Sequence, residues 1–352
     1  MIDLLSNYRS GIERALSQVI RGSEHLSRVN SWGPDLIERL YQFAASGKLI
    51  RGSLVCASAQ AFGSEPGPAA YRVGAVMELI QSFLLIHDDI MDQDAIRRGA
   101  PAVYEQYRLQ GHTDEYANTA RYGESMGICA GDVAVLLAFE AVSTLELPPP
   151  LVVAVSRFVA AEIADVGVAQ MADVAHGHQP AEPTEQQILD VYRMKTGRYT
   201  FSVPLVLGAM LAGAEQNAIS AVSEWGEIQG VIFQLRDDEL GLMGETNEIG
   251  KPAGTDVSSD KKTLHRALLL ARCAESGCEE VRRLFGTDEI GEAGMQKVRQ
   301  ALRDTGTLTE LSRRVEALGT KAQPLLDSMT GLTDEGRDAF ARLAEYNASR
   351  ET

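Results

Sequence analysis

Two short stretches of the chain place paired aspartates directly after an apolar run. "SFLLIHDDIMD" contains Asp88, Asp89 and Asp92, and "GVIFQLRDDELG" contains Asp237 and Asp238. In a helix, Asp88 and Asp92 share one face, about 6 Å apart along the axis, and like charges at that spacing repel. Divalent cations offset this repulsion, because Mg²⁺ prefers carboxylate oxygens and binds substrate phosphates at the same time. The two stretches therefore predict the two halves of a magnesium–diphosphate site.

The elements that must position these aspartates are helices. Apolar residues recur at three- and four-residue spacing in five segments, which are 67–92, 123–145, 151–175, 216–243 and 260–275. Clusters of glycine and proline separate them, and no segment has the period-2 pattern of a strand. Since there is neither an internal repeat nor a long linker, residues 1–352 are predicted to form a single all-α domain of about a dozen helices.

Charge and composition restrict the partners of the protein. The chain has 33 basic and 49 acidic residues, a net charge of −16, and such a surface repels nucleic acid and anionic membranes. No apolar run approaches the roughly 18–20 residues of a membrane span, so stable membrane insertion is not expected. The four cysteines, at positions 56, 129, 273 and 278, show no C-x-x-C spacing. They favour a reduced, cytoplasmic protein.

The order of the chain's motifs is typical of one enzyme family. The motifs are "GKLIRG" (47–52), "DDIMD" (88–92), "RRG" (97–99), "CAGDVAVLLAFE" (129–140), "QMAD" (170–173), "KTG" (195–197), "FQLRDD" (233–238) and "GKPAGTD" (250–256). From about residue 40 to about residue 275 the chain resembles trans-isoprenyl diphosphate synthases of the polyprenyl synthetase family, in particular short-chain geranylgeranyl diphosphate synthases. The resemblance implies an orthogonal helical bundle of the isoprenoid synthase type with a central cavity. It also implies a homodimer, with its interface near residues 123–145.

The resemblance further implies the reaction and its cofactor. Isopentenyl diphosphate would condense head to tail with an allylic diphosphate, which is dimethylallyl, geranyl or farnesyl diphosphate. Mg²⁺ is the implied cofactor, with three ions present when substrate is bound. The residues agree with this chemistry, because departure of diphosphate from carbon requires positive charge that stabilises the developing negative charge.

Individual roles carry over from the matching motif positions. The implied metal ligands are Asp88, Asp92 and Asp237, with Asp89 and Asp238 as further ligands or supports. Lys195 joins the aspartates as a catalytic residue. The residues implied for the allylic diphosphate are Arg97, Lys195, Thr196, Gln234 and Lys251, and those for isopentenyl diphosphate are Lys48, Arg51, Gln81 and Arg98. Arginine suits the latter site because its planar fork binds phosphate oxygens in pairs.

Three positions depart from the family's pattern. Gly241 stands where many members have a third aspartate, so metal binding there relies on the preceding aspartate pair, helped by Asp256 or by water. Gln81 replaces a histidine that touches isopentenyl diphosphate, and its amide can still donate a hydrogen bond. Gly52 replaces a proline, which is expected to change only the local stiffness of the backbone.

Product length depends on the helix that precedes the first aspartate cluster. One helical turn rises about 5.4 Å, roughly one isoprene unit, and Leu84, Phe83 and Ile80 lie four, five and eight positions before Asp88. A lone aromatic residue five positions before DDxxD resembles the pattern of archaeal-type geranylgeranyl synthases. A C20 product is therefore predicted, with C15 farnesyl diphosphate and longer chains as the alternatives. If Phe83 is an ordinary core residue, this prediction loses its basis.

Two other classes of function compete with this interpretation. A class I terpene cyclase also has two metal sites, but its second site usually reads Asn-Asp…Ser/Thr…Glu, and it does not need the "GKLIRG" segment. A non-catalytic prenyltransferase subunit is expected to lose its aspartates, whereas Asp88, Asp89 and Asp92 are all present here. A prenyltransferase is therefore the favoured function.

Overall fold

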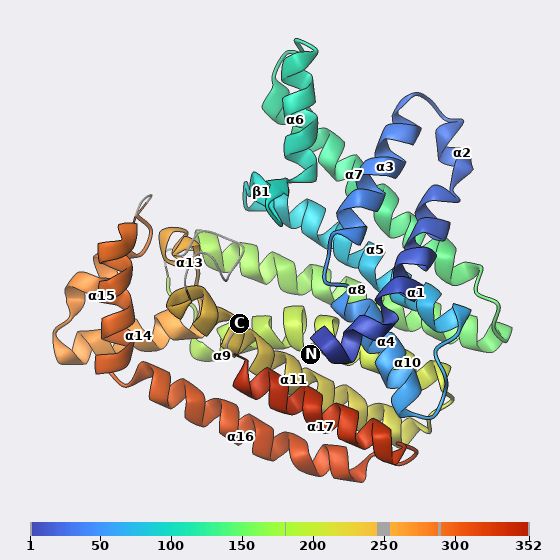
Figure 1. The fold of residues 1–352 in the computed structure, drawn as a ribbon. Helices are drawn as coiled ribbons and strands as arrows, with labels where there is room; N and C mark the ends of the chain where they lie inside the picture. The colour runs from blue at the N-terminus through green and yellow to red at the C-terminus, as the bar shows by residue number, and fades with distance from the viewer. Residues whose placement is uncertain (1, 180, 245–253, 288–289, 351–352) are drawn as a thin grey trace. The chain divides into compact units, whose positions relative to one another are not determined.

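The structure is a computed structural model that describes residues 2–179, 181–244, 254–287 and 290–350, and in these the chain is helical apart from one short hairpin (Figure 1). The predicted all-α fold class is confirmed. The helices group into two compact units. We call residues 2–159 and 204–214 the N-terminal unit, and residues 160–203 and 215–352 the C-terminal unit. That residues 1–352 form one domain stays a prediction.

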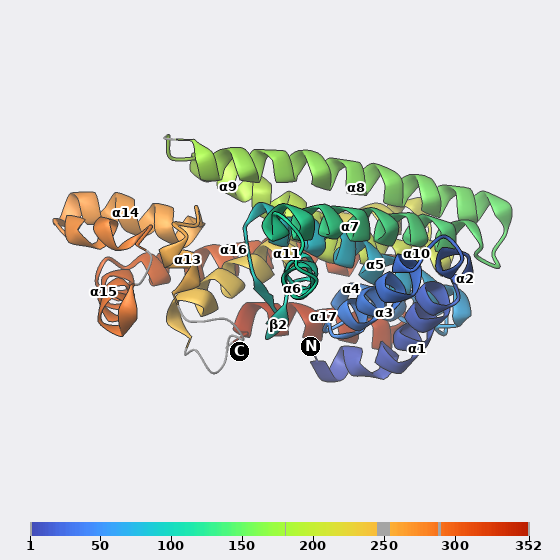
Figure 2. The ribbon, with the colours of Figure 1, turned by 90° about the horizontal axis from the view of Figure 1, so that it is seen from above.

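The helices of both units agree with the apolar periodicity of the sequence. The N-terminal unit comprises α1 (Ile2–Arg21), α2 (Glu24–Ser27), α3 (Trp32–Ala45), α4 (Ile50–Ala61), α5 (Pro68–Met91), β1 (Ile96–Arg97), β2 (Ala100–Pro101), α6 (Val103–Thr113), α7 (Thr119–Ser143), the start of α8 (Pro149–His178) and nearly all of α10 (Val203–Leu211). The C-terminal unit comprises the rest of α8, α9 (Glu185–Tyr192), the π-helix η1 (Arg193–Ser202), α11 (Gln216–Met243), α13 (Thr255–Ser258), α14 (Leu264–Ser276), the 3-10 helix η2 (Glu279–Leu284), α15 (Gly291–Asp304), α16 (Thr307–Ser328) and α17 (Asp334–Ser349). Figure 2 shows α8 as one long continuous helix.

α5 is the central helix of the N-terminal unit. It packs against α1, α4 and α7, and it buries apolar residues such as Met77 and Ile80. Pro68 suits its first position, because the N–H that proline lacks would have no helical partner there. A Cβ at Gly52 of α4 would lie 2.9 Å from the carbonyl oxygen of Gly74 in α5. Gly52 therefore allows two helix backbones to touch, and the prediction that it changes only local stiffness is wrong.

Two helices of the N-terminal unit, α5 and α7, are long and apolar enough to cross a membrane by length and composition. In their most apolar stretches, 61% of α5 and 44% of α7 is buried inside the structure. Core helices of soluble proteins pass the same test, and polar residues interrupt the apolar runs of both helices. The smaller buried share of α7 reflects an exposed apolar side, on which Ile128 and Leu136 are 40% and 66% exposed.

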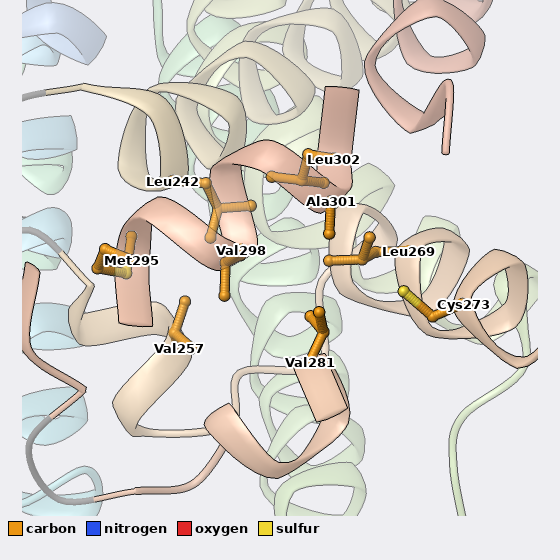
Figure 3. Packing of buried hydrophobic residues seen from close by; sticks show 9 residues of the cluster. All are labelled: Leu242, Val257, Leu269, Cys273, Val281, Met295, Val298, Ala301 and Leu302. Atoms are coloured by element: carbon orange, nitrogen blue, oxygen red, sulfur yellow. The ribbon is translucent and has the colours of Figure 1, made fainter. Parts of the chain in front are cut away.

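α11 is the central helix of the C-terminal unit. It packs against η1, α16 and α17, and its Trp225 stacks on Phe340 of α17 with the ring centroids 5.0 Å apart. An apolar cluster lies at the C-terminal end of α11 (Figure 3). Its buried members are Leu242, Val257, Leu269, Cys273, Val281, Met295, Val298, Ala301 and Leu302. Burial of these side chains holds α13, α14 and α15 against the end of α11 that carries the second aspartate cluster.

Two local features differ from prediction. β1 and β2 form an antiparallel hairpin that the sequence did not predict, because strands of two residues leave no period-2 pattern. Cys273 and Cys278 are joined by a disulfide, so the expectation of four reduced cysteines is wrong for this pair. Cys56 and Cys129 are unpaired, as expected.

Candidate active site

The first aspartate cluster lies at the C-terminal end of α5. The Asp92 N–H donates to the Asp88 carbonyl at 2.8 Å, so one helical turn carries both residues. Asp88 is half-buried and Asp92 is exposed, whereas Asp89 is fully buried. Arg97 Nε donates to Asp89 Oδ1 at 2.6 Å, and Arg97 also pairs with Asp94 at 3.0 Å. Burial raises the pKa of Asp89 to about 6, although Arg97 opposes the shift. Asp88 and Asp92 are therefore the accessible carboxylates.

A tight turn sends two neighbouring arginines to different partners. Arg98 and Gly99 connect β1 to β2 with φ values of 55° and 75°, the left-handed conformation that a two-residue hairpin loop requires. Arg97 reaches Asp89, whereas Arg98 Nη1 donates to the carbonyl oxygen of Phe43 at 2.8 Å. The hairpin thus separates the two guanidinium groups, to which the family resemblance assigns different diphosphates.

Arg98 meets other predicted isopentenyl diphosphate residues just before α4. A Cβ at Gly47 would lie 3.0 Å from the Arg98 guanidinium, so the glycine leaves room for that group. Lys48 next to it is exposed, and Arg51 in the first turn of α4 is half-buried. Gln81, the fourth predicted residue, is half-buried on α5. The structure therefore gathers Lys48, Arg51 and Arg98 around the start of α4.

Glu78 is a member of this group that sequence reasoning missed. Its side chain is 4% exposed, and its Oε1 accepts the N–H of Gly52 at 2.8 Å. Burial raises the pKa of Glu78, and the positive charges of Arg51 and Arg98 act against the shift. A signal was available, because Glu78 is the only charged residue in the apolar segment 74–86.

The predicted chain-length residues lie on α5 before the first cluster. Ile80 is fully buried, and Phe83 and Leu84 are half-buried. Phe83 meets His87 edge to face, with the ring centroids 4.9 Å apart. His87 Nε2 in turn lies 3.1 Å from the Ile128 carbonyl oxygen of α7. Phe83 therefore belongs to the side of α5 that faces α7, and its role in chain length stays a prediction.

The second aspartate cluster lies near the C-terminal end of α11. The Asp237 side chain is 51% exposed, whereas Asp238 is 2% exposed. The Tyr192 hydroxyl donates to Asp238 Oδ2, and Gln234 Nε2 donates to Asp238 Oδ1 at 2.7 Å. Burial raises the pKa of Asp238 to about 6, although the Lys261 ammonium and these two donors act in the opposite direction. Asp237 is therefore the accessible carboxylate of this pair.

The π-helix η1 brings predicted allylic diphosphate residues to α11. A Cβ at Gly230 of α11 would lie 2.5 Å from the Cα of Gly197, so the two backbones approach this closely only with glycine. As a result, Thr196 Oγ1 donates to Gln234 Oε1 at 2.7 Å. π-helical turns are frequent at functional sites because they displace side chains from the regular helical pattern.

A cavity of about 120 Å³ lies beside this contact, within the C-terminal unit. Its polar lining includes Asp173, Lys195, Thr196, Gln234, Lys261 and Lys262. Lys195 Nζ pairs with Asp173 at 2.6 Å. The structure therefore brings Lys195, Thr196 and Gln234 together as predicted, and Lys251 lies outside the described residues. Asp173 belongs to the "QMAD" motif, but the sequence alone assigned it no role.

The end of the chain also reaches the second aspartate cluster. Arg350 Nη1 donates to Asp237 Oδ1 at 3.1 Å, and the Arg350 guanidinium lies 4.5 Å from the centroid of the Phe233 ring. Sequence reasoning missed this contact, because the local pattern of the last residues does not relate them to α11. The Arg350 guanidinium thus partly neutralises the most accessible carboxylate of this cluster.

The accessible carboxylates fit a hard divalent cation. Asp88, Asp92 and Asp237 offer oxygen donors, and Asp89 Oδ2 is a buried oxygen without a hydrogen-bond partner among the described residues. In the part of the chain that the structure describes, no three His, Cys, Asp or Glu side chains converge to hold a metal. Mg²⁺ fits such a donor set, because it usually takes one or two carboxylates and completes its shell with water and substrate phosphates.

An all-helical chain with accessible aspartates at two helix ends, each near basic side chains, has the features of a metal-dependent enzyme that acts on diphosphates. The model of the polyprenyl synthetase family matches residues 35–303. The chain therefore belongs to the polyprenyl synthetase family and is a prenyltransferase, as the sequence predicted.

Individual relatives agree with this assignment. The short chain isoprenyl diphosphate synthase of Methanothermobacter thermautotrophicus is 33% identical over 278 residues, which cover 77% of this chain and 73% of the relative. The geranylgeranyl diphosphate synthase of Sulfolobus acidocaldarius is 28% identical over 347 residues, 98% of each chain. Among solved structures, a geranylgeranyl pyrophosphate synthase of Corynebacterium glutamicum, complexed with isoprenyl diphosphate and magnesium, has a TM-score of 0.90 at 28% identity and 99% coverage of both chains.

Proposed function

We propose that this prenyltransferase condenses isopentenyl diphosphate head to tail with allylic diphosphates, using Mg²⁺, and releases geranylgeranyl diphosphate (C20). The observation that carries the proposal is the separation of two kinds of charge. Accessible carboxylates lie at the ends of α5 and α11, whereas Lys48, Arg51 and Arg98 form a group of cations before and within α4. A reaction that joins two diphosphates needs two anion sites, and only the one that loses its diphosphate needs metal ions.

Each aspartate cluster has a part in the proposed binding of the allylic diphosphate. Asp88 and Asp92 of the N-terminal unit, and Asp237 of the C-terminal unit, would be the ligands of Mg²⁺, with three ions present when substrate is bound. These ions supply Lewis-acid stabilisation of the charge that develops on the leaving diphosphate. Lys195 and Thr196 donate hydrogen bonds to the same diphosphate and orient it for departure.

Five further residues belong to the proposed binding of the allylic diphosphate. Asp89 and Asp238 are buried and hydrogen-bonded, so their contribution is to hold Arg97 and Gln234 in place. In the proposal, the donors of Arg97 and Gln234, together with those of Lys251, complete the coordination of the allylic diphosphate.

The cations at the start of α4 form the proposed isopentenyl diphosphate site. Arg51 and Arg98 bind phosphate oxygens in pairs through their planar guanidinium groups, and Lys48 adds an exposed positive charge. Gln81 donates a hydrogen bond from α5. Glu78 supports this site from α5, because its Oε1 accepts the N–H of Gly52 and its charge acts on both arginines.

The C20 product rests on Phe83 and on the relatives named above. A half-buried phenyl ring five residues before Asp88 limits the growing chain by steric exclusion, with Ile80 and Leu84 as further lining. Farnesyl diphosphate (C15) and longer chains are the alternatives that the product assay separates.

A homodimer is proposed on the exposed apolar side of α7. Ile128 and Leu136 are 40% and 66% exposed on this helix, and an obligate interface is large and apolar. Light scattering should then give twice the chain mass of 38.1 kDa, and a monomer at micromolar concentration would contradict the proposal. A cytoplasmic location also remains a proposal, and the Cys273–Cys278 disulfide is an observation against it.

The direct test is product analysis with purified protein. The enzyme is incubated with Mg²⁺, labelled isopentenyl diphosphate and dimethylallyl, geranyl or farnesyl diphosphate, and the products are dephosphorylated and separated by chromatography. The expected product is a C20 alcohol from every allylic starter, and chelation of the metal should abolish it. A hydrocarbon formed from farnesyl diphosphate alone would instead show a terpene cyclase. Absence of any product would indicate a non-catalytic subunit.

A further inference from the structure

In the second aspartate cluster, α11 lacks a carboxylate one helical turn after Asp237. Asp237 and Gly241 are four residues apart in α11 and therefore share one face, as Asp88 and Asp92 do in α5. The first cluster thus presents two carboxylates one turn apart. In the second cluster the position that corresponds to Asp92 is Gly241, which has no side chain.

The carboxylate of Asp256 lies beside this gap. An ideal Cβ at Gly241 would lie 3.1 Å from Asp256 Oδ2 and 3.9 Å from Asp256 Cγ. Asp256 therefore brings its oxygen to within a contact distance of the place where a side chain at position 241 would begin. The Asp256 side chain is 28% exposed, so water and ions reach it.

Packing fixes Asp256 in this position. The next residue, Val257, is fully buried in the same apolar cluster as Leu242, which follows Gly241 (Figure 3). Gly254 begins the turn with φ 90°, and a Cβ there would lie 2.8 Å from Met295 Sδ, so the turn itself requires glycine. Packing between Leu242 and Val257 therefore holds their neighbours Gly241 and Asp256 close together.

The two oxygens of Asp256 have different neighbours. Lys261 Nζ lies 3.7 Å from Asp256 Oδ1. The other oxygen, Oδ2, faces Gly241.

We propose that Asp256 supplies the carboxylate that α11 lacks at Gly241, and that it acts with Asp237 as a ligand of the divalent metal in the second cluster. The inference rests on the proposed function, because it concerns the metal of the allylic diphosphate site. The metal fits this pair of oxygen donors, and water and a diphosphate complete its shell. Of the two alternatives that the sequence left open beside Gly241, Asp256 and water, the geometry favours Asp256.

The test measures metal binding rather than turnover. The melting temperature of the full-length protein is followed as Mg²⁺ is titrated at a fixed concentration of inorganic pyrophosphate, and the Mg²⁺ concentration at half the maximal shift is recorded. Asp256→Asn is isosteric and should fold normally, which circular dichroism checks. It should raise the Mg²⁺ midpoint about 10-fold or more, the size of effect typical for groups that support a metal site.

A relocation variant makes the test specific. In Gly241→Asp/Asp256→Asn the carboxylate moves to α11, and the Mg²⁺ midpoint should return most of the way to the wild-type value. The charge-matched control is Asp338→Asn in α17, whose side chain is 68% exposed and which should leave the midpoint unchanged. An unchanged midpoint in Asp256→Asn, or a raised midpoint that the relocation does not reverse, would overturn the proposal.

A variant without the Lys261 charge distinguishes direct metal binding by Asp256 from an indirect effect through Lys261. If Asp256 only positions Lys261, then Asp256→Asn should have no further effect in a Lys261→Met background, and that result would also overturn the proposal. If Asp256 is a ligand, the substitution raises the midpoint in both backgrounds. The proposed function is tested independently, because it fails only when the wild-type enzyme forms no prenyl diphosphate in the product assay.

Discussion

The two aspartate clusters each pair an accessible carboxylate with a buried one, but they hold the buried carboxylate in different ways. Asp88 and Asp237 are partly exposed, whereas Asp89 and Asp238 are 0% and 2% exposed. Asp89 is bound by the permanent positive charge of Arg97. Asp238 instead accepts hydrogen bonds from the neutral groups of Tyr192 and Gln234, and the Lys261 ammonium is a further charge that acts on it.

The exposed and the buried aspartate of each Asp-Asp pair are suited to different roles. In both clusters we infer that the first aspartate serves the metal and the second organises its surroundings, since burial raises the pKa of Asp89 and Asp238 to about 6. Asp89 fixes a guanidinium at the hairpin, and Asp238 fixes an amide that contacts Thr196 in η1. Identical residue pairs thus position a charged group in one cluster and a neutral donor in the other.

The largest expected effect is loss of activity when the accessible aspartates are removed. Asp88→Ala and Asp237→Ala should each lower kcat by about 10²–10³-fold, equivalent to roughly 3–4 kcal/mol of transition-state stabilisation. Their folds should persist, because the side chains are half-buried or exposed. Steady-state assays with circular dichroism as the control check this, and near-wild-type activity in both variants would show that the metal lies elsewhere.

The next largest effect is on the free energy of unfolding, and it differs between the two buried aspartates. Asp89→Asn should lower the free energy of unfolding by about 3 kcal/mol, because it leaves the mostly buried Arg97 guanidinium with too little negative charge. Asp238→Asn should cost less, about 1–2 kcal/mol, since its hydrogen-bond donors are uncharged and Lys261 keeps Asp256 as a partner. Urea unfolding measures both values.

A compensating variant decides whether charge is the reason for that contrast. Arg97→Met should recover part of the stability lost in Asp89→Asn, because both members of the buried pair are then removed. No comparable recovery is expected from Tyr192→Phe combined with Asp238→Asn, since Leu264 N–H also depends on the Tyr192 oxygen. Equal losses in the two single variants would refute the distinction between the clusters.

Both clusters were recognisable from sequence, but the contacts around the second were less predictable than those of the first. Asp88 and Asp92 share a helix with the apolar run before them, so helical spacing alone placed both on one face. The predicted residues Lys195, Thr196 and Gln234 also came together, because each belongs to a motif on a recognisable helical segment. Local periodicity and motif order therefore gave the helices and most of the proposed ligands.

The parts that sequence reasoning missed or left open all depend on tertiary contacts. Glu78, which was missed, is recognisable as functional only once α4 and α5 bring Arg51 and Arg98 to it. Asp256 was named only as an alternative to water, because its place beside Gly241 depends on the burial of Val257 and no spacing rule relates positions 241 and 256. The partners of buried polar groups are set by packing between elements distant in sequence, which a single sequence does not specify.

A third prediction contrasts the two helices in their control of product length. Phe83→Ala should extend products beyond C20, because it removes the ring proposed to stop the growing chain, and Leu84→Phe should shift them towards C15. The matched change in α11 is Phe233→Ala, four residues before Asp237, which should leave product length unchanged. Chromatography of dephosphorylated products measures all three. If Phe83→Ala folds, remains active and makes the wild-type product, then α5 does not set the limit.

The last predicted effect concerns acid stability and contrasts a histidine of each unit. His265 of α14 is 0% exposed, and neither ring nitrogen has a hydrogen-bond partner among the described residues. Burial, with a contribution from the nearby Arg236, lowers the pKa of His265 to about 3. His87 of the N-terminal unit instead has its Nε2 3.1 Å from a carbonyl oxygen.

The sign of the pH effect of His265 follows from linkage. Because the folded pKa is lower than the unfolded value near 6.5, the unfolded chain binds a proton that the folded protein excludes, and stability is lost as pH falls below about 6.5. Between pH 7 and pH 5 this loss is about 2 kcal/mol. His265→Leu should remove that part of the pH dependence, whereas His25→Leu, at an exposed position of α2, should keep it. Urea unfolding at the two pH values measures the difference, and an identical loss in wild type and His265→Leu would show that the buried imidazole does not limit acid stability.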